Sequence, residues 1–234
     1  MNMATLILLR HGQSLWNAQN KFTGWVDVPL SERGRAEAII AAHRLSDYRV
    51  NVCFTSKLIR AIETAMICLT EHTDICGGKI PIIKHEAGDS DWHGWDQYDG
   101  NPSEELPIFS NAALDERFYG DLQGLNKART AEKYGEEQVQ QWRRSYRVRP
   151  PGGESLEDTQ ERVVAYFSSR ILTHLQQGDN VLVAAHGNSL RSIIMKLENL
   201  SPEEVTKLEL ATGVPIVYDI DSSGQVTDKV ILND

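Results

Sequence analysis

Short strand-like runs of apolar residues alternate along this chain with longer segments of helical periodicity. The apolar runs, which are typical of buried strands, lie at 4–9, 50–55, 80–83, 181–185, 215–220 and 229–232. Segments with helical spacing of apolar side chains lie between them, at 31–45, 58–69, 137–146, 156–175 and 189–197. This alternation predicts an α/β fold of three layers, in which a mainly parallel central sheet has helices on both faces.

Several of the predicted helices begin with a clear start signal. Ser31 is a plausible N-cap, and Ser155 is followed by Asp158 three residues later, as in a capping box. The segment 201–204 combines a serine N-cap, a proline at the first helical position and a glutamate at the third. Neither an internal repeat nor a long linker divides the 234 residues, so we expect a single domain over 1–234.

Composition and cysteine content exclude several classes of protein. Hydrophobic residues make up 41% of the chain and charged residues 24%, which argues against general disorder. No apolar run approaches the ~18 residues that cross a bilayer, and the run at 4–9 is too short for a signal peptide. The three cysteines form no even disulfide framework. We therefore expect a cytoplasmic protein without membrane contact.

The net charge of -9 argues against binding to nucleic acid, which requires surplus Lys and Arg. Seven of the acidic residues lie between 85 and 113, a stretch without Lys or Arg that also holds Trp92, Trp95 and Tyr98. We interpret 85–113 as an acidic insertion, which is either a solvated decoration or a lid. Basic residues gather at 143–149, where at least two of the four arginines should form a solvated face.

Two histidines follow predicted strands directly, and each is followed by glycine. His11 comes after the run at 4–9, and His186 after the run at 181–185. Ligands of parallel sheets gather at the carboxyl ends of strands, so both side chains face one pocket if their strands are neighbours. A single histidine of this kind is often structural, but the repeated pattern with Arg10 beside it favours a site.

These residue types suit phosphoryl transfer. An imidazole can be the nucleophile, and arginines bind the phosphoryl oxygens well because their planar fork matches phosphate. Arg10, Arg60, Arg143 and Arg144 are candidates for that role. Glu116 is the candidate proton donor for a leaving hydroxyl, with a pKa raised by nearby phosphate. The sequence contains no phosphate-binding loop, no Ser nucleophile elbow and no metal-ligand spacing, so we expect no metal.

Longer motifs resemble the cofactor-dependent phosphoglycerate mutases of the histidine phosphatase superfamily. Arg10-His11-Gly12 resembles the superfamily signature, and the segments that resemble the mutase branch lie at 16–17, 21–27, 30–34, 55–61, 116–127, 133–135, 141–146, 184–191 and 211–215. The resemblance implies a metal-independent interconversion of 3-phosphoglycerate and 2-phosphoglycerate in glycolysis and gluconeogenesis. The phosphoryl group would be carried by His11 after priming by 2,3-bisphosphoglycerate.

The resemblance also implies roles for individual residues. Glu116 would be the acid–base residue, and the transferring phosphoryl group would be held by Arg10, Arg60, His186 and Gly187, with Asn17 assisting. The substrate carboxylate would contact Thr23 and Gly24. The non-reacting phosphate would be held by Tyr119, Lys127, Arg143 and Arg144, with Asn188 at the rim. The partners would be small phosphoglycerates alone, and a homo-oligomer is compatible with the sequence.

Two alternatives remain at this stage. A metal-independent histidine phosphatase for small phosphate esters would use the same His11 intermediate and pass the phosphoryl group to water. The short junction at 150–155 resembles the phosphatase branches and could open the pocket to water. A non-catalytic scaffold is disfavoured because the whole set of candidate catalytic residues is present.

Overall fold

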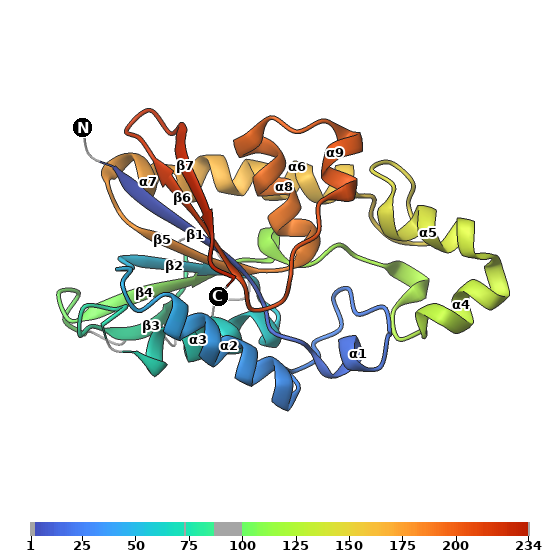
Figure 1. The fold of residues 1–234 in the computed structure, drawn as a ribbon, viewed down its shortest axis with the longest axis horizontal. Helices are drawn as coiled ribbons and strands as arrows, with labels where there is room; N and C mark the ends of the chain where they lie inside the picture. Colours follow the sequence, from blue (N-terminus) through green and yellow to red (C-terminus); the bar gives the residue numbers. More distant parts are fainter. Residues whose placement is uncertain (1–2, 73, 87–99, 234) are drawn as a thin grey trace.

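A computed structural model describes residues 3–72, 74–86 and 100–233 of the chain. In these residues seven strands form one sheet in the order β3-β4-β2-β5-β1-β6-β7 (Figure 1). The strands are β1 (Ala4–Arg10), β2 (Val52–Thr55), β3 (Ile80–Lys84), β4 (Glu105–Ser110), β5 (Val181–Ala185), β6 (Pro215–Ile220) and β7 (Val226–Ile231). The last strand begins three residues before the predicted run at 229–232.

The sheet is parallel over most of its width. β5 pairs in parallel with β1 on one side and β2 on the other, and β4 continues the parallel part to β3. Only β6 and β7 run antiparallel to their neighbours among the described strands. The predicted mainly parallel sheet is therefore confirmed, and β1 and β5 lie side by side at its centre.

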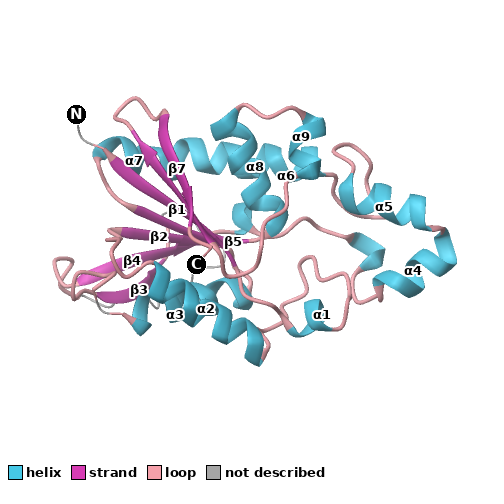
Figure 2. Ribbon diagram, viewed as in Figure 1, coloured by secondary structure: helices cyan, strands magenta, loops and turns pink. Residues whose placement is uncertain are grey.

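Helices cover both faces of this sheet, as predicted (Figure 2). One core cluster packs α2 (Glu32–Arg44) and α3 (Ile59–Glu71) against one face, through residues such as Leu45 and Leu69. The opposite cluster contains Val163, Phe167 and Ile193 from the other helices. These are α6 (Leu156–Tyr166), a π-helical segment (Phe167–Ile171), α7 (Leu172–Gln177) and α8 (Gly187–Glu198), with α9 (Pro202–Lys207) beyond.

The predicted helix starts are confirmed. Ser31 Oγ accepts a hydrogen bond from the Gly34 N–H at 3.1 Å and caps α2. Ser155 and Asp158 form a reciprocal capping box at α6, and Ser201 forms another with Glu204 at α9. Side-chain oxygens thus satisfy the free N–H groups of the first helical turns.

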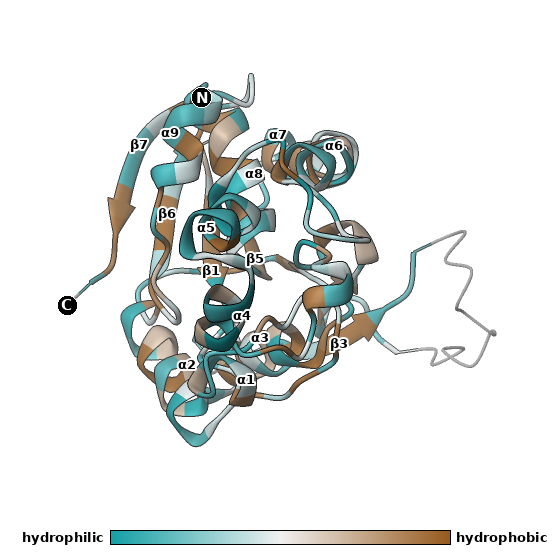
Figure 3. Ribbon diagram, turned by 90° about the vertical axis from the view of Figure 1, so that its right-hand side faces the viewer, coloured by the Kyte–Doolittle hydropathy of each residue, from teal (hydrophilic) through white to brown (hydrophobic). Residues whose placement is uncertain are grey.

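A further group of short elements lies beyond the carboxyl ends of the central strands. It comprises α1 (Leu15–Ala18), two 3-10 turns (Ala112–Leu114 and Gly120–Leu122), α4 (Lys127–Tyr134) and α5 (Glu136–Arg144). A small core of Phe22, Leu122, Val139 and Trp142 joins the second turn, α5 and the loop after α1, whereas Leu114 of the first turn packs in the core with Val163 and Ile193. Figure 3 shows α4 and α5 in front of the sheet with largely hydrophilic surfaces.

The acidic stretch at 85–113 contributes a strand to the sheet. Its residues 105–110 form β4, which lies between β3 and β2, and Glu105 pairs with Lys84 of β3 at 2.7 Å. This part was not predicted as a strand, because Glu105 and Pro107 interrupt the apolar pattern of a buried strand. Residues 87–99, including Trp92, Trp95 and Tyr98, lie outside the described residues. No helix in the described ranges has the length and apolar content of a membrane span.

Candidate active site

His11 and His186 meet at the centre of the sheet, as their strand-end positions predicted. β1 and β5 pair so that Arg10 lies opposite Ala185, and each histidine follows directly. The His11 N–H donates to the Ala185 carbonyl at 3.0 Å, which continues the hydrogen-bond ladder of the two strands to His11 itself. The two imidazole rings are 4.9 Å apart between centroids in an edge-to-face arrangement. One phosphoryl group between them could contact both.

The surroundings of His11 prepare its ring as a nucleophile. Its Nδ1 lies 2.6 Å from the Gly12 carbonyl oxygen, which can only accept, so Nδ1 carries the proton and Nε2 keeps its lone pair. Burial lowers the pKa of His11 well below its ordinary value, and the nearby Arg60 and Arg10 lower it further. The imidazole is therefore neutral at physiological pH, as nucleophilic attack requires.

Two glycines allow the His11 loop to cross the first turn of α2. A Cβ at Gly12 would collide with the Gly34 backbone, and a Cβ at Gly34 would lie 2.8 Å from the Gln13 nitrogen and closer to its oxygen. The crossing is secured by Ser31, whose N–H donates to the Gln13 carbonyl at 2.8 Å. The position of His11 is thus fixed by direct backbone contact with α2.

His186 lies in an equally enclosed position. Its Nε2 is 2.7 Å from Ser56 Oγ, and its Nδ1 has no hydrogen-bond partner within the described ranges. Burial lowers the pKa of His186 well below its ordinary value, with Arg60 the next cause. A neutral ring with an unused polar atom in a buried site is suited to bind an incoming phosphoryl oxygen.

Arg60 and Arg10 supply positive charge beside the two rings. The buried Arg60 donates to the carbonyls of Gly24 at 2.7 Å and Val26 at 3.0 Å, which also fixes the loop that carries Thr23. Burial lowers the pKa of Arg60 to about 10, so it remains charged at neutral pH. Arg10 donates one Nη1 bond to the Leu210 carbonyl at 2.6 Å, while its buried Nε has no partner in the described structure.

Glu116 is held beside these cations by three hydrogen bonds. Its Oε1 accepts from the Arg117 N–H at 2.7 Å, from Asn188 Nδ2 at 2.8 Å and from the Asn188 N–H at 3.2 Å. Burial alone would raise the pKa of Glu116, but these bonds, together with Arg10 and Arg60, hold it below its ordinary value. The sequence prediction of a raised pKa concerned the phosphate complex; without ligand, the carboxyl is ionised.

A second group of cations lies around Asn188, which binds Glu116. Four arginines and Asn188 line one small cavity: Arg117, Arg143, Arg144 and Arg191. The buried Arg117 donates to Tyr119 Oη at 3.0 Å, whereas its Nε and Nη1 have no partner among the described residues. Arg144 instead pairs with Glu209 at 2.6 Å. This arrangement places a second cluster of positive charge close to the first.

The other predicted residues surround this region. Lys127 begins α4 and, with Arg143, lines a hollow of about 550 Å³ between α4 and α5. Thr23 is buried with an Oγ1 that has no partner in the described part, and Gly24 has a φ of +53°. Asn17 caps α1 through its Oδ1, which accepts from the Ser14 N–H. Gly187 opens α8 beside Arg10.

Sequence reasoning missed Ser56, Arg117 and Arg191. Arg191 lies one helical turn after Asn188 and donates to its Oδ1 at 3.3 Å, a spacing that could have indicated it. The expected solvated arginines are Arg147 and Arg149, whose largely exposed side chains pair with Glu157 and Asp158. Nowhere in residues 3–72, 74–86 and 100–233 do three His, Cys, Asp or Glu side chains gather in a way that could hold a metal.

Comparison with known proteins places these residues in a family context. The sequence model of the histidine phosphatase superfamily (branch 1) matches residues 6–87 and 100–232. A protein of Gloeobacter violaceus named 2,3-bisphosphoglycerate-dependent phosphoglycerate mutase 1 is 75% identical over 98% of this chain and 99% of its own. A protein of Gloeothece citriformis named 2,3-bisphosphoglycerate-dependent phosphoglycerate mutase is 69% identical over 99% of this chain and 100% of its own.

Solved structures share the fold at low sequence identity. Bacillus stearothermophilus YhfR superposes with a TM-score of 0.73 at 23% identity, covering 95% of this chain and 94% of its own. A putative alpha-ribazole-5'-P phosphatase from Escherichia coli gives 0.73 at 22% identity, covering 99% and 96%. At such identities the likeness concerns the fold alone.

Proposed function

This chain belongs to the histidine phosphatase superfamily, and we propose that within it the chain is a 2,3-bisphosphoglycerate-dependent phosphoglycerate mutase. It interconverts 3-phosphoglycerate and 2-phosphoglycerate, a step of glycolysis and gluconeogenesis. The observation that carries this proposal is the pair of arginine clusters near Glu116, one formed by Arg10 and Arg60 and the other lining the cavity beside Asn188. A mutase must hold a reacting phosphoryl group and a second anionic group at once, and the two clusters of arginines offer one site for each.

The residues at the site fit a bisphosphorylated primer. Several buried donors lack partners among the described residues, namely Arg10 Nε and Arg117 Nε and Nη1. Such groups are costly to bury unless a ligand pairs with them. We propose that 2,3-bisphosphoglycerate supplies the phosphoryl group that His11 carries. It would be held by Arg10, Arg60, His186 and Gly187 on the reacting side, and by Tyr119, Lys127, Arg143 and Arg144 on the other.

His11 provides the nucleophile of the proposed mechanism. The Nε2 lone pair attacks phosphorus, the bond from phosphorus to the ester oxygen breaks, and Nδ1–H stays bonded to the Gly12 carbonyl. That bond stabilises the positive charge that the ring gains when Nε2 becomes phosphorylated. Arg10 and Arg60 would neutralise the phosphoryl oxygens in the transition state.

Glu116 moves the proton. In the phosphorylated enzyme the substrate hydroxyl attacks the phosphoryl group on His11, and the ionised Glu116 accepts the hydroxyl proton. Because its pKa is lowered without ligand, the carboxyl is ionised and free of the proton that it must accept in this first step. The two phosphates of the resulting complex raise its proton affinity, so the same carboxyl then protonates the oxygen that leaves from the other position. Thr23 and Gly24 are proposed to bind the carboxylate, with Asn17 and Asn188 completing the site.

The short junction at 150–155 contacts the Glu116 loop. The Pro151 carbonyl accepts from the Asp121 N–H at 2.9 Å, and the Glu154 N–H donates to the Phe118 carbonyl at 2.8 Å. These hydrogen bonds hold the loop between Glu116 and Asp121 in place, so the junction stabilises the loop that carries Glu116. We further propose a single domain over 1–234 with an acidic insertion around 85–113, and a cytoplasmic location.

An enolase-coupled assay tests the proposed function. It follows 2-phosphoglycerate formation from 3-phosphoglycerate, with and without 2,3-bisphosphoglycerate, in the presence of a chelator, while free phosphate is measured in parallel. We expect activation by the bisphosphate, resistance to the chelator and little free phosphate. Release of phosphate without 2-phosphoglycerate would support a phosphatase instead.

A further inference from the structure

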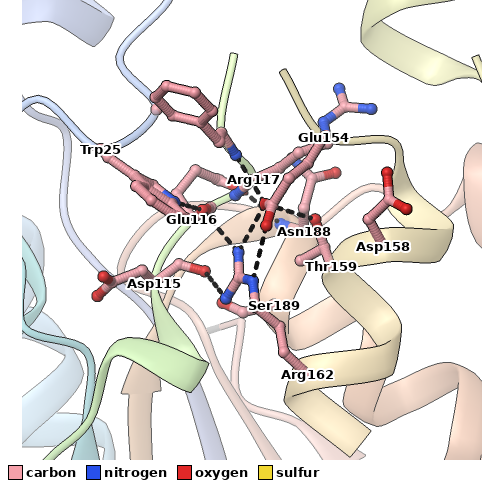
Figure 4. A network of polar contacts seen from close by, with 12 residues as sticks. Trp25, Asp115, Glu116, Arg117, Glu154, Asp158, Thr159, Arg162, Asn188 and Ser189 are labelled. Atoms are coloured by element: carbon pink, nitrogen blue, oxygen red, sulfur yellow. Dashed lines mark hydrogen bonds and ion pairs between the residues drawn. The ribbon is translucent and has the colours of Figure 1, made fainter. Parts of the chain in front are cut away.

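A single arginine of α6 contacts most of the main chain that leads to Glu116 (Figure 4). Arg162 Nη1 donates to the Ala113 carbonyl at 2.9 Å and the Asp115 carbonyl at 3.0 Å, and lies 3.3 Å from that of Ala112. Its Nη2 donates to the Glu116 carbonyl at 2.9 Å. One guanidinium group therefore satisfies four carbonyls in five consecutive residues.

Glu154 holds this guanidinium in place and also contacts the loop. Its two carboxylate oxygens accept from Arg162 Nε at 3.1 Å and Nη2 at 2.9 Å, which is a bidentate pair. Oε2 also accepts from the Phe118 N–H at 2.9 Å. Both side chains are about four-fifths buried, with 21% and 20% exposure, so solvent screens the pair less than it would a surface ion pair. The loop is thus bound on both sides of Glu116.

The Glu116 carbonyl has a second donor from another part of the chain. Trp25 Nε1 donates to it at 2.6 Å, and the Trp25 ring packs on Phe118 with centroids 4.7 Å apart. Trp25 follows Gly24, whose carbonyl is bound by Arg60. Arg162 and Trp25 therefore both bind the backbone carbonyl of Glu116, and they fix the main chain of the residue that carries the carboxyl group.

We propose that Arg162 and Glu154 are a positioning pair that sets the place of the Glu116 carboxyl relative to His11, an inference that rests on the proposed function of Glu116. Neither side chain needs to contact substrate in this role. The pair makes proton transfer precise, since a displaced carboxyl would lose the alignment on which general acid–base catalysis depends. Lysine cannot replace Arg162 here, because an ammonium group lacks the planar fork that reaches Glu154 and several carbonyls together.

The experiment compares two reactions that differ in their need for a proton donor. The interconversion of phosphoglycerates breaks a bond to an alkoxide-like oxygen, which must be protonated as it leaves. With p-nitrophenyl phosphate, attack by His11 breaks the bond to an aryl oxygen, and p-nitrophenolate leaves as a stable anion without a proton. The phosphoryl group stays on His11, so only the first turnover, seen as a burst of p-nitrophenolate, needs no proton transfer. Arg162→Lys is expected to lower mutase kcat by about 10- to 100-fold while the rate of this burst changes less than about threefold.

Two further measurements separate positioning from a structural role. A displaced Glu116 would have weaker hydrogen bonds from Arg117 and Asn188, which in the native protein lower its pKa. The acidic limb of the pH profile of mutase kcat should therefore shift to higher pH in Arg162→Lys. Arg147→Lys is the matched control. Arg147 forms an exposed ion pair with Glu157 of α6 at 3.2 Å and has no contact with the loop at 112–118 in the part of the chain that the structure describes, so it should leave both reactions unchanged.

The outcomes are distinct. A selective loss of mutase turnover with a shifted pH profile supports the proposal. An equal loss of both reactions in a folded variant, or mutase kcat within about threefold of the wild type, overturns it. If Arg162→Lys does not fold, Glu154→Gln decides by the same comparison, since it keeps the shape and removes the charge. A wild-type chain that does not interconvert phosphoglycerates would refute the proposed function itself, before any variant is made.

Discussion

Replacement of Gly34 by alanine tests whether contact with α2 positions the nucleophile. Gly34 lies in the first turn of α2, where helix propensity alone predicts that alanine stabilises the protein by about 1 kcal/mol. The structure predicts the opposite. The new Cβ would lie 2.8 Å from the Gln13 nitrogen and 2.9 Å from its carbonyl carbon, whereas ordinary van der Waals contact begins at 3.4 Å.

The magnitude follows from this geometry. The Gln13 carbonyl oxygen would lie closer still, so the two segments must separate by more than 0.6 Å, the difference between 3.4 and 2.8 Å, and Gln13 is only two residues from His11. Overpacking of this kind costs about 1–3 kcal/mol of unfolding free energy. Since a misplacement of about 1 Å can cost about 100-fold in rate, we expect kcat to fall by roughly 10- to 100-fold.

Urea unfolding measures the stability of Gly34→Ala, and the enolase-coupled assay measures its kcat. Glu32→Ala is a suitable control, because it changes an exposed position of the same helical turn without placing an atom against Gln13, whereas Arg33 pairs with Glu37, which binds the Gln13 N–H. A variant that is stabilised by about 1 kcal/mol with normal turnover would refute the reasoning, since helix propensity would then outweigh the proposed contact.

Three further predictions concern charge. Glu116→Gln should lower mutase kcat by about 10²–10⁴-fold in the coupled assay, and a near-normal rate would remove Glu116 from its proposed role. The ligand-free protein should lose stability as the pH falls below 6.5, because burial keeps His11 and His186 neutral in the folded protein while both bind protons in the unfolded chain. Each histidine then lowers the free energy of unfolding by up to about 1.4 kcal/mol per pH unit. His11→Asn should therefore show a shallower slope in urea unfolding at pH 6.5 and 5.5, and equal slopes would contradict this. Glu209→Gln should free Arg144 and lower the KM for 3-phosphoglycerate by at most about fivefold with kcat unchanged, since an exposed ion pair is worth about 1 kcal/mol or less; a raised KM would contradict it.

The strand-end histidines could be predicted because the relevant signal is local. A buried strand followed by His-Gly places the side chain at the carboxyl edge of a parallel sheet, and only the adjacency of β1 and β5 had to be established by the structure. The N-caps at Ser31 and Ser155 were also predictable, since a capping interaction spans only three or four residues.

Elements without a clear apolar period were missed. β4 contains Glu105 and Pro107, and its place in the sheet depends on pairing with two distant strands. α4 buries only Thr130, so its sequence lacks the apolar stripe that indicates an amphipathic helix. In both cases tertiary contacts outweighed the local pattern.

The missed site residues share a different cause. Arg117 and Arg162 carry the charge of ordinary surface arginines, and nothing in the adjacent sequence indicates that they are buried. Arg117 is fully buried in the structure, and Arg162 is surrounded by carbonyls from a segment about 50 positions away. A role that depends on distant backbone acceptors has no local sequence signal.

The proposed mechanism depends on His11 Nε2 carrying the phosphoryl group during turnover. Incubation with 2,3-bisphosphoglycerate, followed by an alkaline quench and peptide mass spectrometry, tests it directly. We expect a single phosphoryl group on His11, which disappears on addition of 3-phosphoglycerate at least as fast as the enzyme turns over, and no such group in His11→Asn. A label on another residue, or full mutase activity in His11→Asn, would contradict it.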